Sequence, residues 1–152
     1  MIWSSLGSVH DIIQNTNLIL FTETHEKVVK GLSPFTGYSW ISTFRTSTHQ
    51  GSYKRGLGGV AFLINDRLHR RMWVEGIDTH ARYIWLSIAR SPPLRRLYIA
   101  CCYFPTMTSC YAIHGEGESP FLDLFPDISR YAVHEDIILV GDFNGRTRSL
   151  QT

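Results

Sequence analysis

The chain has 152 residues, 43% of them hydrophobic and 18% charged, and a net charge of +2 at neutral pH. These values predict one folded domain with an apolar core and exclude an intrinsically disordered chain. Residues 1–10 do not form a secretory signal, and no apolar run can span a bilayer, so we expect an intracellular protein, nuclear or cytoplasmic, without membrane attachment. The small positive charge permits a nucleic acid as a partner but does not require one.

The first half of the chain predicts one helix and three strands. Apolar residues at helical spacing indicate a helix over residues 4–15, and a continuous apolar run over 18–21 indicates a strand covered on both faces. Residues 38–46 alternate as a strand does, residues 49–59 are Gly-rich and basic as in a surface loop, and residues 60–64 predict a buried strand.

The middle of the chain predicts a set of hairpins. After a turn at residues 65–66, residues 71–77 are expected to return as the hairpin partner of the buried strand before them. Residues 82–89 alternate most clearly, residues 90–96 with two prolines predict a turn, and residues 97–103 predict the next strand. Cys101, Cys102 and Cys110 are odd in number and lack metal spacing, so we expect reduced thiols.

The last part of the chain predicts a helix and a final strand. Residues 105–119 are irregular, and Pro120 opens an apolar helical pattern in which Pro126 is expected to separate two short helices. Residues 137–140 predict another buried strand. The whole pattern, taken as a single domain over residues 1–152, indicates a mixed α/β fold with parallel and antiparallel neighbours.

Polar side chains follow three of the predicted strands: Glu23, Tyr103, and the pair Asp142 and Asn144. Ligands of open α/β sheets bind beyond the carboxyl ends of strands, so we expect these four side chains to converge on one rim. Mg²⁺ needs only one or two carboxylates together with water and phosphate oxygens. Glu23 suits the anchoring ligand, and Asp142 can orient or deprotonate an attacking water. Asn144 can hold a phosphate oxygen or fix the carboxylate, and Tyr103 offers a hydroxyl to the phosphate.

Each of these residues also has a plain structural interpretation. A glutamate after a strand is often solvated, an Asp-x-Asn sequence often forms an Asx turn, and a tyrosine often lines a core. No histidine has the spacing of a zinc site or a catalytic triad, and the glycines near residue 58 precede a strand, which argues against a P-loop. Solvated charge is the default interpretation of the basic clusters, although Arg146 and Arg148 beside the site would suit a nucleic-acid backbone; these clusters are residues 54–55, 67–71, 90–96 and 146–148.

Four of these segments, in this order, resemble the endonuclease/exonuclease/phosphatase superfamily. They are residues 22–25 (TETH), 58–64 (GGVAFLI), 103–105 (YFP) and 141–144 (GDFN). Residues 141–147 (GDFNGRT) are most similar to the apurinic-endonuclease-like domain of LINE-type retrotransposons.

The resemblance implies a four-layer α/β sandwich that hydrolyses phosphodiester or phosphomonoester bonds with Mg²⁺, or with Mn²⁺ in its place. It implies that Glu23 is the metal ligand, that Asp142 positions or activates the water, and that Asn144 and Tyr103 assist at the phosphate. It further implies that DNA is the substrate of an intact relative.

The chain also departs from the family pattern at both ends. The expected Asn-bearing first strand and the expected downstream Asp and Asp-His pair are missing, so we expect a partial, catalytically impaired domain with an uncovered strand edge and poor solubility. Two alternatives stay open: a non-catalytic, nucleic-acid-binding remnant, and a phosphoesterase acting on lipid or inositol phosphates. The sequence makes no prediction of oligomeric state.

Overall fold

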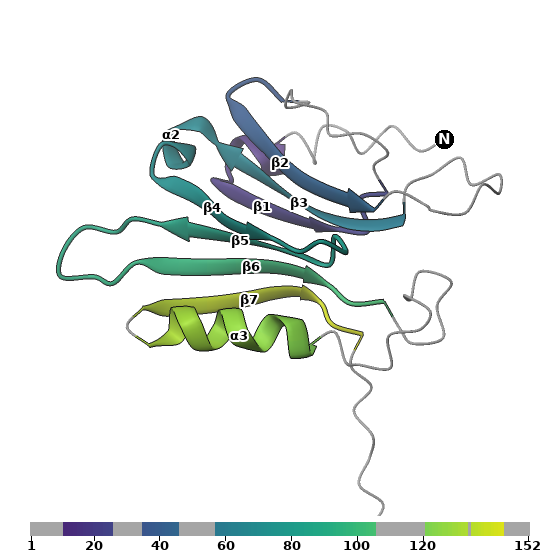
Figure 1. Ribbon diagram of the computed structural model, residues 1–152. Coiled ribbons are helices and arrows are strands. Elements are labelled where there is room, and N and C mark those ends of the chain that lie inside the picture. The colour runs from purple at the N-terminus through teal and green to yellow at the C-terminus, as the bar shows by residue number, and fades with distance from the viewer. Residues whose placement is uncertain (1–10, 26–34, 46–56, 106–120, 134, 145–152) are drawn as a thin grey trace, which may run out of the picture.

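Two β-sheets lie face to face in the computed structural model, which describes residues 11–25, 35–45, 57–105, 121–133 and 135–144 (Figure 1). The first sheet has three strands in the order β1-β3-β2, and the second has four in the order β4-β5-β6-β7. All neighbouring strands are antiparallel except β6 and β7, which run parallel. The strands are β1 (Leu18–Thr22), β2 (Tyr38–Arg45), β3 (Leu57–Asn65), β4 (Met72–Ile77), β5 (Tyr83–Ile88), β6 (Leu97–Tyr103) and β7 (Asp136–Asp142).

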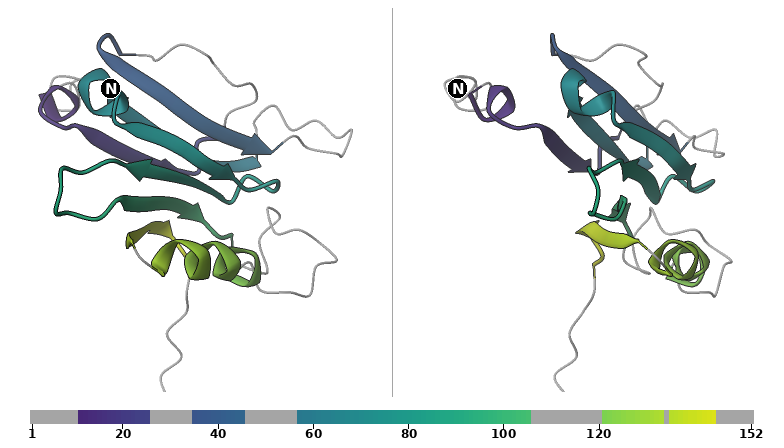
Figure 2. Two further views of the ribbon diagram at one scale, coloured as in Figure 1. Left: turned by 60° about the vertical axis from the view of Figure 1, so that its left-hand side comes forward. Right: turned by 90° about the vertical axis from the view of Figure 1, so that its left-hand side faces the viewer.

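Helix α3 (Phe121–Ala132) joins β6 to β7 and covers the outer face of the four-stranded sheet (Figure 2). The short helix α2 (Asp66–His69) lies between β3 and β4, and residues 11–14 form a helical turn ahead of β1. The layers are therefore three-stranded sheet, four-stranded sheet and helix, which confirms the predicted α/β class with mixed strand directions. No helix within the described ranges has the length and apolar character needed to cross a lipid bilayer.

The apolar core has two parts, one on each face of the four-stranded sheet. Because successive side chains of a strand point to opposite faces, β5 and β6 each contribute side chains to both parts of the core. The part between the sheets contains Val60, Phe62, Ile64, Met72, Ile84, Leu86, Ile99, Cys101 and Tyr103. The part beneath α3 contains Tyr83, Trp85, Ala100, Cys102, Phe104, Leu124 and Tyr131.

Most of the predicted strands are confirmed. Strands β1, β2, β5 and β6 begin and end within two residues of the predicted ranges, and β3 contains the whole predicted run of residues 60–64. Of the predicted first helix, residues 11–14 are helical, Asn15 forms a turn, and residues 4–10 lie outside the described residues. The irregular segment after β6, with Cys110, also lies mostly outside them. Cys101 and Cys102 are free thiols, as predicted, and they lie on opposite faces of β6.

The predicted partner of β4 was wrong. Strand β4 pairs with β5, whereas β3 pairs with β1 and β2 in the other sheet. Asn65 does begin a turn, but its side chain accepts a hydrogen bond of 3.0 Å from the backbone N–H of Arg67 and so caps α2. This helical turn carries the chain from one sheet to the next, which a tight hairpin would not do. The predicted loop also ends earlier than expected, because residues 57–59 already belong to β3.

Two further predictions need correction. Pro126 does not divide the helix: α3 is continuous, with Pro126 on its exposed side, and Leu124 and Tyr131 bury against the sheet on either side of the proline. Strand β7 was predicted to be buried, but Ile138, Leu139 and Val140 are 38–44% exposed. The reason is topological, because β7 is an edge strand with a neighbour on one side only. Strand β1 is an edge strand too, and it is only half-buried.

Candidate functional site at the rim of the sheets

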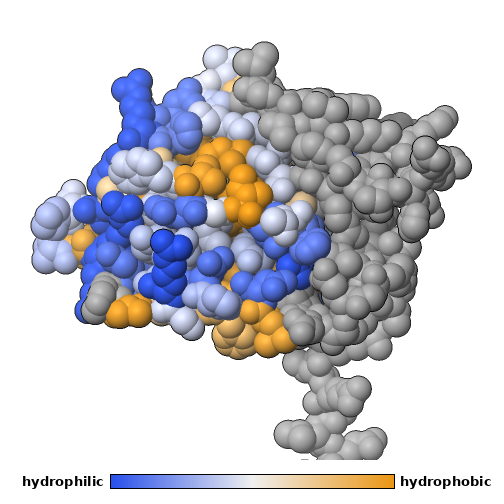
Figure 3. Space-filling view, in the orientation of Figure 1, coloured by the Kyte–Doolittle hydropathy of each residue, from blue (hydrophilic) through white to orange (hydrophobic). Residues whose placement is uncertain are grey.

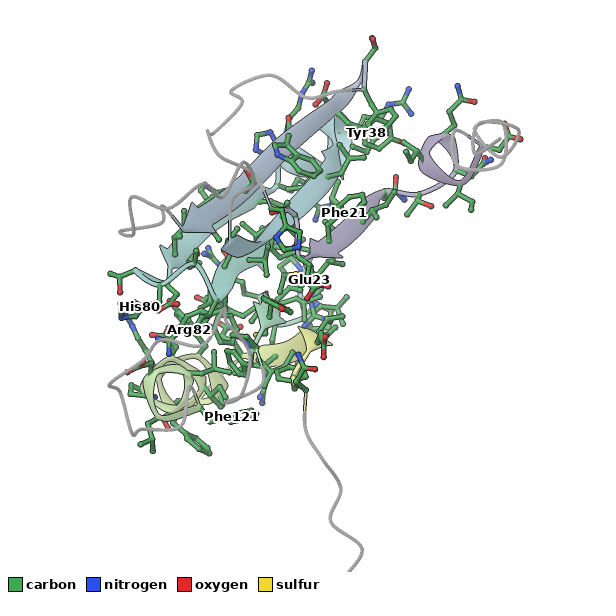
Figure 4. The ribbon with its side chains drawn as sticks, turned by 90° about the vertical axis from the view of Figure 1, so that its right-hand side faces the viewer. Phe21, Glu23, Tyr38, His80, Arg82 and Phe121 are labelled. Carbon is green, nitrogen blue, oxygen red and sulfur yellow. The ribbon has the colours of Figure 1, made fainter. Side chains whose placement is uncertain are left out.

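The side chains of Glu23 and Tyr103 meet where β1 and β6 end. The Tyr103 hydroxyl donates a hydrogen bond of 2.5 Å to Oε1 of Glu23, across 80 residues of sequence. Figure 4 looks onto this end of the molecule, with the exposed Glu23 at the exit of β1. We refer to this region, residues 23–25, 58–59, 103–104 and 142–144, as the rim.

Asp142 lies beside Tyr103 on the neighbouring strand. The two residues are direct partners in the parallel pairing of β6 and β7, so their side chains leave the same face of the sheet, and that face looks toward the three-stranded sheet. The backbone N–H of Phe104 donates to the Asp142 carbonyl at 2.9 Å, which continues the pairing beyond the end of β6. Glu23 and Asp142 therefore flank Tyr103 at one rim.

Asn144 contacts the Asp142 carboxylate, which is one of the two roles predicted for it, and it does so through its backbone. Its backbone N–H donates to Oδ1 of Asp142 at 2.9 Å, which is the Asx turn that the sequence left open. Its side-chain Nδ2 donates to the Phe104 carbonyl at 2.9 Å. Asn144 thus fixes the Asp142 carboxylate and joins the exits of β6 and β7, and one of the two N–H groups of its side-chain amide is used by the Phe104 carbonyl.

The backbone at the rim is unusually strained. Glu23, His25 and Asn144 have φ angles of 54°, 50° and 44°, and they are three of the four non-glycine residues with positive φ in the described part of the chain. Each such conformation costs about 1–3 kcal/mol and tends to occur at functional sites. A backbone hydrogen bond between segments stabilises this conformation: the N–H of His25 donates to the Gly58 carbonyl at 2.8 Å.

Two glycines allow the strands to approach closely at the rim. Gly58 has φ +60°, and a Cβ there would lie 3.2 Å from Cε1 of Tyr103. Gly141 has φ +138°, and a Cβ there would lie 1.9 Å from the Cys102 carbonyl oxygen. Gly58 therefore gives room for the Tyr103 ring, and Gly141 lets β7 run against β6 up to Asp142. Sequence reasoning noticed both glycine-containing segments but assigned neither glycine a contact.

The donor set at the rim suits a small, hard cation. A carboxylate has two oxygens with about four lone-pair sites, so the bond from Tyr103 leaves Glu23 able to accept a ligand. The side-chain oxygen of Thr24 is buried and has no hydrogen-bond partner among the described residues, which marks a position for water or a ligand. Over the same residues, no group of three or more His, Cys, Asp or Glu side chains is arranged to hold a metal. These donors fit Mg²⁺, which takes few carboxylates, better than they fit zinc.

An ion-pair network that the sequence did not indicate secures the same end of the molecule. The guanidinium of Arg82 contacts Asp78 at 2.8 Å and Asp123 at 2.5 Å, which ties the start of α3 to the β4–β5 turn (Figure 4). Burial alone would lower the pKa of Arg82, but hydrogen bonds to both aspartates raise it above its ordinary value. Its carbonyl accepts from the Tyr103 N–H at 2.7 Å. Arg82 is thus a structural support next to the rim.

No protein-family model matches this chain. No curated protein matches its sequence, and no solved structure matches its fold. The functional proposal for this protein therefore depends on the residues and geometry of the rim.

Proposed function

We propose that this chain is an endonuclease/exonuclease/phosphatase-type domain, of the kind found in LINE-type retrotransposons, whose rim supplies part of a site for Mg²⁺-dependent hydrolysis of phosphodiester bonds in DNA. The observation that carries this proposal is the hydrogen bond between Tyr103 and Glu23, with Asp142 paired to Tyr103 on the next strand. Three sequence segments that share no local contact thereby supply polar groups to one rim. The layer order of sheet, sheet and helix is also that of three successive layers in a four-layer α/β sandwich.

The roles of the residues follow from their contacts. The Tyr103 hydroxyl donates a hydrogen bond to Glu23 and so orients that carboxylate, and the backbone N–H of Asn144 does the same for Asp142. Glu23 would hold the cation, and Asp142 would accept a proton from, or orient, the attacking water. Mg²⁺ bound there would neutralise charge on the scissile phosphate and stabilise its transition state. In this arrangement Tyr103 is a positioning residue.

A nicking assay tests the proposal. Supercoiled plasmid should be nicked only with Mg²⁺ or Mn²⁺, and Asp142→Ala and Glu23→Gln should each lower the rate by about 10²-fold or more. Glu135→Gln makes the same charge change as Glu23→Gln at the far end of β7 and should keep the parent rate. Nicking that persists in Asp142→Ala, or that does not depend on the added cation, would refute the assignment.

A non-catalytic nucleic-acid-binding domain is the second candidate, and one observation favours it. One N–H of the Asn144 side-chain amide donates a hydrogen bond to the Phe104 carbonyl, so that N–H is not available to bind a phosphate. Calorimetric titration with Mg²⁺ separates the two candidates. Binding that is lost in Glu23→Gln supports the hydrolase, and oligonucleotide binding without any cation binding supports the second candidate.

A further inference from the structure

Two arginine-rich segments that are distant in sequence meet at the end of the molecule opposite the rim. Residues 67–71 lie in α2 and in the turn that leads into β4, and residues 90–96 form the turn between β5 and β6 (Figures 1 and 2). Arg71 donates from Nη2 to the Ala89 carbonyl at 2.8 Å, and the Ala89 N–H donates back to the Arg71 carbonyl at 3.0 Å. We refer to the six arginines of these two segments as the arginine end: Arg67, Arg70, Arg71, Arg90, Arg95 and Arg96.

The arginine end is well separated from the rim. Strand β6 begins beside Arg96 and ends at Tyr103, and its seven residues span about 20 Å. Arg71 precedes β4, Arg90 follows β5 and Arg96 precedes β6, and these adjacent strands are spaced by about 4.8 Å. Hydrophilic side chains gather over this part of the face shown in Figure 3.

Positive charge is only partly neutralised there. Arg90 pairs with Asp136, and Arg96 contacts Glu75 at 3.5 Å. Two further carboxylates are near, Glu135 beside Asp136 and Asp66 in α2, where Asp66 accepts a hydrogen bond from Ser39 at 2.9 Å. The remaining four arginines form no ion pair with any described residue, and all four are exposed: Arg67, Arg70, Arg71 and Arg95.

An exposed aromatic ring stands next to these charges. Trp73 on the edge strand β4 is 48% exposed, and the guanidinium of Arg96 lies 5.2 Å from its ring centroid. A large indole left in water beside arginines provides a stacking surface for a planar group. Arginine guanidinium groups bind phosphate oxygens in a bidentate manner, and the backbone of a nucleic acid carries one phosphate per nucleotide.

We propose that the arginine end binds single-stranded nucleic acid, with the unpaired arginines on its phosphates and Trp73 against a base. This surface is separate from the rim, so the proposal does not depend on the hydrolase function. It would hold a strand about 20 Å from the site where the rim acts.

Fluorescence anisotropy of a labelled single-stranded oligonucleotide, titrated with the full chain at several salt concentrations, tests the proposal. Replacing two exposed arginines in Arg70→Gln/Arg95→Gln should weaken binding roughly 10- to 30-fold at 0.1 M salt and reduce the slope of log affinity against log salt by about 1.4. Arg70→Lys/Arg95→Lys keeps the charges and should retain most of the affinity. Trp73→Ala should lower the affinity about 10-fold and leave the salt slope unchanged.

Asp142→Asn keeps this proposal distinct from the hydrolase. Nicking should be lost in this variant, whereas Arg70→Gln/Arg95→Gln should lower oligonucleotide affinity by the same factor in this background as in the parent. Equal affinity of the parent and Arg70→Gln/Arg95→Gln would overturn the proposal. Binding to phosphatidylserine vesicles without binding to the oligonucleotide would overturn it as well, because the arginine end would then be a membrane surface.

Discussion

Strands β3 and β7 have similar apolar sequences and opposite surroundings. Val60 to Ile64 in β3 are all 0% exposed, whereas Ile138 in β7 is 44% exposed and Val140 is 38% exposed. Strand β3 has a neighbour on each side, packs on the second sheet with one face, and is covered on the other by the rings of Phe21 and Trp40, 5.4 Å apart. Strand β7 has one neighbour and one covered face. Apolar character therefore marks both as strands, but position in the sheet decides how much each contributes to stability.

The largest expected effect lies in β3. Phe62→Ala removes a fully buried ring between the sheets and should lower the free energy of unfolding by about 3–5 kcal/mol. Val140→Ala in β7 should lower it by less than about 1 kcal/mol, because much of that side chain already meets water. Urea denaturation of the two variants measures the difference, and equal losses would contradict the comparison.

Alkaline pH should lower the stability of the fold through the two buried cysteines of β6, the strand that packs between β3 and β7. Burial raises the pKa of Cys101 and of Cys102 to about 12, from an ordinary 9.0. The unfolded chain therefore ionises its thiols first, and the stability that is complete below pH 9.0 is lost as the pH rises from 9.0 toward 12. At about 1.4 kcal/mol per pKa unit and thiol, the loss near pH 10 is about 3 kcal/mol.

Urea unfolding at pH 8 and pH 10 measures this loss. The double variant Cys101→Ala/Cys102→Ala keeps both positions apolar and should show a much smaller change between the two pH values. The same decrease in parent and variant would assign the alkaline effect to other groups.

Gly141→Ala should destabilise the fold although it lies in the exposed strand β7. The new Cβ would lie 1.9 Å from the Cys102 carbonyl, so β7 must move, and the backbone conformation alone costs about 1–3 kcal/mol. Gly37→Ala is the matched control, since Gly37 has φ +82° and nothing within 4 Å. Thermal unfolding should show a larger loss at position 141 than at position 37, and the reverse order would be inconsistent with close pairing of β6 and β7.

The smallest effect on stability, and a clear effect on association, is expected for Val140→Lys. An apolar edge strand offers unpaired backbone groups and side chains to another molecule, and a lysine there opposes such pairing. Light scattering should show less self-association than in the parent, with unfolding changed by about 0.5 kcal/mol or less. Val140→Ile, which keeps the edge apolar, should associate like the parent, and a lysine variant that associates equally would exclude β7 as the contact.

Local patterns in the sequence determined where the strands lie and which residues reach the rim. Alternation along residues 82–89 predicted β5 to within one residue at each end, because a strand side chain repeats every two positions, and the predicted strand over residues 97–103 is β6. The expectation that Glu23, Tyr103 and Asp142 follow strand ends on one rim agrees with the hydrogen bond between Glu23 and Tyr103 and with the register of Tyr103 and Asp142. The chemistry assigned to them stays a prediction.

The tertiary structure alone decided which strands pair and which are covered. Strand β4 pairs with β5 rather than β3, β7 is an edge, Gly58 lies against the Tyr103 ring, and two arginine segments share one end. The spacing of apolar residues along one segment predicts none of these features, because each depends on contacts between residues that are far apart in the chain. A repeat of apolar residues predicts that one face of an element is buried, and only the packed fold determines which other strand or helix covers that face.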